Sequence, residues 1–136
     1  LGSRKISRIF IPRKFDPTRL IKAWDIYVDI LHHHKYHNNY DYQKSILLVN
    51  KIPFYDSGFV ILREDERLVS PISVVYLERY EDADDLSRKL ESISGKIQCI
   101  VGNTQHAYIP FGQAQAPELW DYADKVDTMK FLENLA

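Results

Sequence analysis

The sequence is poor in cysteine and has no strong excess of either charge. One of its 136 residues is a cysteine, Cys99, which excludes an internal disulfide and any multi-cysteine zinc site. Lysine and arginine number 18 and aspartate and glutamate 19, so the net charge is −1. A near-neutral chain lacks the basic surface that phosphate-backbone binding requires, and we expect no nucleic-acid partner. The lone cysteine also fits a reducing, cytoplasmic location.

Long apolar runs and glycine-rich motifs are also missing. The longest apolar runs, residues 46–49 and 59–62, are far shorter than the roughly 18 residues of a membrane span, so we expect none. The five glycines are isolated, and neither a G-x-G-x-x-G fingerprint nor a P-loop occurs. The chain has no initiator methionine and opens Leu1-Gly2-Ser3, which looks cut from a longer protein or left over from its preparation.

What the chain does have is a pattern of alternating strands and helices. With 45% hydrophobic residues it can bury a core. Periodicity and turn residues predict strands over residues 6–11, 59–63, 73–80 and 96–101, with a shorter one at 108–111. They predict helices that start at Asp16, Asp41, Asp82, Pro117 and Asp127, the first fading in His32–His34 and the next two ending near Asn50 and Gly95. The almost continuous apolarity of residues 74–77 is typical of a strand buried on both faces. We therefore expect an α/β fold with a mainly parallel sheet flanked by helices.

The histidines and the single cysteine are the residues that could form a metal site or a nucleophile. Histidines stand at positions 32, 33, 34 and 37, and two pairs have helical spacing, but no nearby acid supplies a third metal ligand. A polar helix end explains them better, and we expect no metal. Cys99 is surrounded by apolar residues of a predicted strand, which indicates a small core residue rather than a nucleophile.

An aromatic group near the middle of the chain has two interpretations. Its members are Tyr36, Tyr40, Tyr42, Phe54 and Tyr55. They could line an apolar pocket for a long-chain substrate, or they could be core residues; the sequence leaves both open.

Six segments, in one order along the chain, resemble a known family. They are residues 38–45 (NNYDYQKS), 53–59 (PFYDSGF), 64–71 (EDERLVSP), 96–101 (KIQCIV), 109–114 (IPFGQA) and 117–122 (PELWDY). Together they resemble the C-terminal part of bacterial acyl-CoA reductases of the bioluminescence type, a branch of the aldehyde dehydrogenase superfamily.

The resemblance implies a fold and an activity. Residues 1–136 would be the C-terminal part of an aldehyde-dehydrogenase-like catalytic domain, with the nucleotide-binding domain mostly outside this chain. Such enzymes use NADPH to convert a fatty acyl-CoA into a fatty aldehyde through a covalent acyl-enzyme. Members of the superfamily are commonly homo-oligomers, so the resemblance implies a second copy of the chain as a partner.

The resemblance also implies two site residues. Ser3 occupies the position of the family's nucleophilic cysteine, and a serine hydroxyl is much harder to activate than a thiol. Glu66 lies one residue before the position of a carboxylate that binds the nicotinamide ribose, and Arg67 occupies that position itself. A solvated turn acid is the other interpretation of Glu66.

The serine leaves a second function open. A non-catalytic acyl-CoA-binding or assembly module on the same fold would not need the cysteine. An acyltransferase or thioesterase that uses Ser3 is less favoured, because no Gly-x-Ser-x-Gly elbow occurs.

Overall fold

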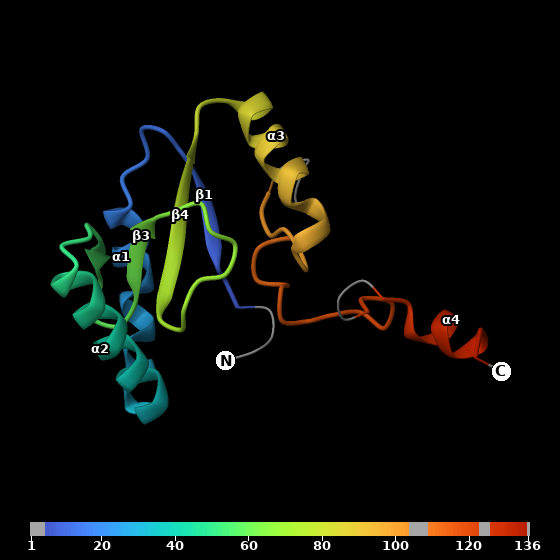
Figure 1. The fold of residues 1–136 in the computed structure, drawn as a ribbon, viewed down its shortest axis with the longest axis horizontal. Helices are drawn as coiled ribbons and strands as arrows, with labels where there is room; N and C mark the ends of the chain where they lie inside the picture. Colours follow the sequence, from blue (N-terminus) through green and yellow to red (C-terminus); the bar gives the residue numbers. More distant parts are fainter. Residues whose placement is uncertain (1–4, 104–108, 123–125, 136) are drawn as a thin grey trace. The chain divides into compact units, whose positions relative to one another are not determined.

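The computed structural model describes residues 5–103, 109–122 and 126–135, drawn in Figure 1. The chain forms two compact units, Ile6–Leu86 and Ser87–Ala136 with Leu1–Lys5. The elements are, in order, β1 (Arg8–Pro12), α1 (Thr18–Trp24), the 3-10 helix η1 (Asp25–His32), α2 (His34–Val49), β2 (Tyr55–Asp56), β3 (Ile61–Glu64), β4 (Val74–Tyr80), α3 (Ala83–Ile93), the 3-10 helix η2 (Ser94–Lys96) and α4 (Thr128–Glu133).

The first unit contains a four-stranded sheet with the order β1-β4-β3-β2, and Figure 1 shows β4 between β1 and β3. β4 pairs in parallel with both neighbours, whereas β2 and β3 pair antiparallel. The predicted α/β fold with flanking helices is therefore confirmed; two of the three strand pairings are parallel, and the β2–β3 pairing makes the sheet mixed. The reason is the tight turn between β2 and β3, where Gly58 has a φ of 91° and its N–H donates to Asp56 Oδ1 at 2.8 Å. Such a turn returns the chain antiparallel.

Each face of the sheet packs against a different helical segment. On one face Leu62, Val75 and Leu77 pack with Leu20 and Trp24 of α1 and with residues of η1. On the other face Ile61, Val74 and Tyr76 pack with Tyr40 and Leu47 of α2. Alternate residues of β3 and β4 thus enter different cores, which explains the almost continuous apolarity of β4.

The second predicted helix starts earlier than expected. The sequence predicted a start at Asp41, but α2 begins at His34 and runs through Asn38, Asn39 and Asp41. His33 caps it, since His33 Nδ1 accepts a hydrogen bond from Tyr36 N at 3.3 Å. Tyr36, Tyr40 and Leu47 are buried on one side of α2, and this packing outweighs the low helix propensity of asparagine.

The chain after α3 departs most from prediction. The strand expected over residues 96–101 is absent: η2 covers its first residue and Val101 forms only an isolated bridge with Ile109. A strand needs a partner along its length, and one residue pair does not supply it. Residues 109–111 form no strand beyond that bridge, Tyr108 is outside the described residues, and turns replace the helix expected from Pro117.

Other boundaries were predicted well. Asp16 Oδ1 accepts from Thr18 N at 2.9 Å, and Asp127 Oδ1 accepts from Lys130 N at the start of α4 at 3.0 Å. The first α-helix, however, ends at Trp24, and a 3-10 helix continues to His32.

In the parts of the chain that the structure covers, no helix is both long and apolar enough to span a bilayer.

Candidate functional site

The loop between β3 and β4, residues 65–73, carries Glu66. It connects two parallel neighbouring strands without a helix. Asp65 starts the loop and its N–H donates to the carbonyl oxygen of Leu77 at 3.1 Å, which attaches the loop to β4. Glu66 follows directly; its side chain is exposed, and it forms no ion pair within the described ranges. Its carboxylate is thus available to a ligand.

A row of three side chains lies on the sheet face beside this loop. Arg8 of β1 and Arg63 of β3 are both in register with Tyr76 of β4. In-register residues of parallel strands project from the same face about 4.8 Å apart. Arg67 of the loop lies over the Tyr76 ring, with 5.1 Å from Cζ to the ring centroid, a cation–π distance. Three arginines therefore surround one buried tyrosine.

Two carboxylates balance part of this positive charge. Asp65 Oδ2 is 2.9 Å from Arg63 Nη2 and 2.8 Å from Arg67 Nη2. The hydrogen bonds from Arg67, opposed by partial burial, hold the pKa of Asp65 below its usual value. Glu78 pairs with Arg8 at 2.5 Å, and the two side chains are 9% and 8% exposed.

Three arginines, Arg8, Arg63 and Arg67, face three acids in this cluster: the ion-paired Asp65 and Glu78, and Glu66. Nε and Nη2 of Arg8 and Nε of Arg63 are buried, and none has a hydrogen-bond partner among the described atoms. A charged carboxylate, Glu66, therefore projects from a loop whose neighbours on both sides are held by ion pairs. Such a group can accept hydrogen bonds from paired hydroxyls of a ligand.

The other predicted site residue, Ser3, lies outside the described residues, and its role stays a prediction. What the structure describes is the entry to β1: the carbonyl oxygen of Ser7 accepts from Tyr76 N at 2.9 Å.

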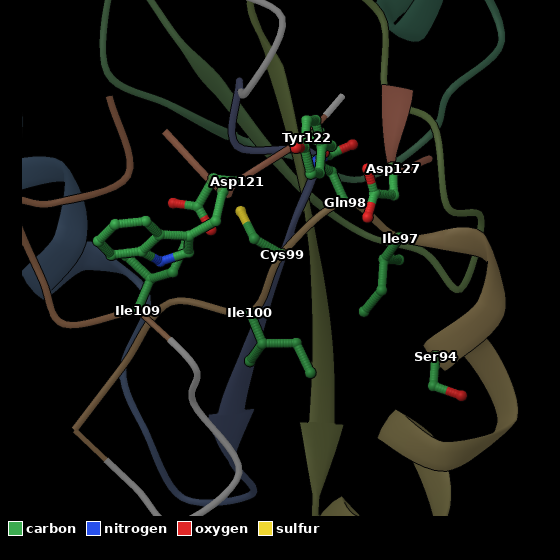
Figure 2. Close-up of a pocket in the computed structure, with 10 residues that line it drawn as sticks. Ser94, Ile97, Gln98, Cys99, Ile100, Ile109, Asp121, Tyr122 and Asp127 are labelled. Carbon is green, nitrogen blue, oxygen red and sulfur yellow. The ribbon is translucent and has the colours of Figure 1, made fainter. Parts of the chain in front are cut away.

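The second unit contains a separate pocket of about 470 Å³. Its lining includes three isoleucines, two aromatic residues and two acids, together with Cys99 and Gln98. Figure 2 shows the Cys99 thiol pointing toward Asp121. Cys99 is half-buried, so the prediction of a buried core cysteine is wrong. The cause is the missing strand, which would have placed its side chain in a sheet.

The histidines serve local structure. His33 caps α2, and His37 Nε2 is 3.5 Å from Asp41 Oδ2 in the next turn. Within the described residues no three histidine, cysteine or acidic side chains come together as a metal site requires.

Of the aromatic group, Tyr36 and Tyr40 are buried, whereas Tyr42 is 62% exposed. This favours the core interpretation for Tyr36 and Tyr40.

Sequence reasoning pointed to Glu66 and Arg67 but missed Arg63, Asp65 and Tyr76 as neighbours. The available signal was the spacing of Arg63, Asp65 and Arg67, three charged residues two apart.

Comparisons of the chain with protein-family models, with curated proteins and with solved structures found no match.

Proposed function

We propose that this chain is a segment of an acyl-CoA reductase that uses NADPH to convert a fatty acyl-CoA into a fatty aldehyde and free CoA. The order of the six family-like segments motivates the proposal. The structural observation that supports it is the exposed carboxylate of Glu66, which has no ion pair among the residues the structure describes and lies on a loop held by ion pairs beside a parallel strand. An aldehyde-dehydrogenase-like catalytic domain, with this loop next to the cofactor, is part of the same proposal.

The reaction divides into two steps. The side chain at position 3 attacks the thioester carbon, the carbon–sulfur bond breaks, and CoA leaves as a thiolate that takes up a proton. Glu66 would hold the ribose of bound NADPH, and the cofactor would supply the hydride that reduces the acyl carbon by two electrons. The bond to the enzyme would then break, and the aldehyde would depart as the side chain at position 3 is reprotonated.

The residues of this loop fit one part of the cofactor. The Glu66 carboxylate is an acceptor for the two hydroxyls of a ribose, and Arg67, whose side chain is 61% exposed, favours an anionic molecule nearby. The sequence has no glycine-rich phosphate loop. We therefore assign the nicotinamide ribose to Glu66 and no diphosphate contact to the described residues.

Ser3 supports a second candidate, an acyl-CoA-binding module without turnover. A serine without an activating base is a poor nucleophile. Binding would then persist while reduction would be absent.

The test uses the full-length gene product that contains this chain. We expect acyl-CoA-dependent loss of NADPH absorbance together with formation of aldehyde. Glu66→Gln keeps the shape but removes the charge, and we expect it to raise the KM for NADPH about tenfold, the worth of one charge-assisted hydrogen bond. Glu91→Gln, an exposed change in α3, is the matched control and should leave that KM unchanged.

Each outcome decides between the candidates. Acyl-CoA binding without NADPH loss, restored to reduction by Ser3→Cys, would identify Ser3 as the reason for inactivity within the reductase machinery. Binding without turnover in both forms would favour the binding module. Absence of acyl-CoA binding and of reduction would reject both.

A further inference from the structure

Asp65 closes a hydrogen-bonded ring that contains the backbone of Glu66. Its Oδ1 accepts a hydrogen bond from the backbone N–H of Arg67 at 3.0 Å, an Asx turn with Glu66 as its middle residue. The same carboxylate accepts from Arg67 Nε at 2.9 Å and from Arg67 Nη2 at 2.8 Å. The backbone on both sides of Glu66 is therefore tied to one side chain.

The side chain that forms this ring is itself fixed. Asp65 is 10% exposed, its Oδ2 is 2.9 Å from Arg63 Nη2, and its backbone N–H donates to Leu77 O. Arg63 and Leu77 belong to two adjacent strands, β3 and β4. Asp65 thus attaches the loop to the rigid centre of the sheet.

The far side of the ring has a second attachment. The Arg67 guanidinium lies 5.1 Å from the centroid of Tyr76, whose side chain is 1% exposed. Arg67 is therefore held between Asp65 and Tyr76, and Glu66, between the two anchored residues, is the one that projects into solvent.

We propose that Asp65 is a positioning residue that fixes the backbone carrying Glu66, so that the Glu66 carboxylate projects from an ordered loop toward the cofactor ribose. This inference rests on the proposed function. A loop that already holds its ligand-binding group loses less conformational entropy on binding, so its affinity is higher. The two anchors at the ends of one residue supply that preorganisation.

The simplest competing explanation is that the Asp65 contacts stabilise only the fold. Asp16 offers a matched control in the same unit, because its Oδ1 also forms an Asx turn, accepting from Thr18 N at 2.9 Å. If the Asp65 contacts stabilise only the fold, Asp65→Ala should lower the unfolding free energy more than Asp16→Ala, because it also removes two ion pairs, and neither change should alter NADPH binding.

The experiment is a double-mutant cycle on the full-length protein, read out as the Kd for NADPH by fluorescence titration and as the KM for NADPH. We expect Asp65→Ala to weaken NADPH binding about tenfold, like Glu66→Gln, and the double variant to be no weaker than either, since Asp65 acts through Glu66. Asp65→Asn keeps the Asx acceptor and loses the ion pairs, and should show a smaller loss. kcat at saturating NADPH should change less than twofold.

A second measurement does not depend on activity. Hydrogen exchange of the Arg67 amide should become at least tenfold faster in Asp65→Ala and stay near the wild-type rate in Asp16→Ala. Unchanged exchange of the Arg67 amide in Asp65→Ala would overturn the proposal. A double variant whose NADPH affinity falls by the product of the two single-variant losses would also overturn it. Normal NADPH binding by Glu66→Gln would instead overturn the proposed role of Glu66, and with it the positioning role.

Discussion

Tyr40 of α2 joins the helix to the β2–β3 hairpin through its hydroxyl. The hydroxyl donates to Asp56 Oδ1 at 2.5 Å, and Lys44, one turn further along α2, is 2.7 Å from Asp56 Oδ2. Tyr40 and Lys44 lie on one face of α2, where Lys44 Nζ also donates to the Tyr40 hydroxyl at 3.4 Å. Here burial, together with the hydrogen bond to Asp56, raises the pKa of Tyr40 to about 12. The phenol therefore stays protonated, which indicates a structural role.

We expect Tyr40→Phe to lower the free energy of unfolding by about 1–2 kcal/mol, because it removes one partly buried hydrogen bond to a charged acceptor. Urea unfolding measures this change. Tyr42→Phe is the control. Because Tyr42 is 62% exposed, this change should alter the free energy of unfolding by no more than about 0.5 kcal/mol. Equal effects of the two changes would contradict the assigned role of Tyr40.

At the scale of an element, α2 ends in a Schellman motif that lacks its usual glycine. Ile52 N donates to Leu47 O at 2.9 Å and Lys51 N to Leu48 O at 3.1 Å, the two bonds that define the motif. Lys51 takes the left-handed conformation with a φ of 54°. A residue with a Cβ is strained in this conformation.

Lys51→Gly should raise the free energy of unfolding by about 0.5 kcal/mol, because relief of the left-handed strain slightly exceeds the entropy cost of glycine. Chemical denaturation of the variant checks the sign. Ser45→Gly in the middle of α2 has no strain to relieve and should destabilise the protein by a similar amount. A loss of stability in Lys51→Gly would show that the strain is absent.

The sequence predicted the elements whose signals are local. Asp82 and Asp127 marked the starts of α3 and α4, where their carboxylates accept hydrogen bonds from Asp85 N and Lys130 N. α2 was misjudged because Asn38 and Asn39 disfavour a helix locally, while the burial of Tyr36 and Tyr40 decides the outcome from outside the segment. The strand over residues 96–101 failed for the opposite reason: its composition favours a strand, but pairing depends on a neighbour that the local pattern does not specify.

The candidate site shows the same limit. Glu66 and Arg67 were found from a family-like segment. The grouping of Arg8, Tyr76 and Arg63 depends on the register of three strands, and no pattern within any one of them sets that register. Long-range contacts of this kind decide which charged side chains become neighbours, so sequence reasoning finds individual site residues more readily than their surroundings.

At the scale of the whole molecule, the two units differ in how much they bury. The first contains both hydrophobic clusters. Among the described residues of the second, Leu90 alone is buried, whereas Leu119, Trp120 and Phe131 are 94%, 71% and 56% exposed. Local opening should therefore require much less free energy in the second unit.

Hydrogen exchange of this chain should separate the two units. We expect the amides of β4 to exchange more than about a thousandfold more slowly than those of residues 97–103, because sheet opening requires most of the global unfolding free energy. Mass spectrometry of peptic peptides measures both regions in one sample. Equal protection of the two would contradict the difference in burial.

The position of β4 in the sheet determines the order in which the chain can fold during synthesis. β4 pairs with both β1 and β3, and the ion pair between Arg8 and Glu78 joins residues 70 positions apart. β1 leaves the ribosome first, but its strand neighbour follows only after α1, α2 and the hairpin have been made. At about 5–20 residues per second, Ile9 and Ile11 remain unpaired for several seconds. Such long-range pairing also slows folding, so the nascent chain exposes an apolar strand for chaperones to bind until residue 80 has emerged.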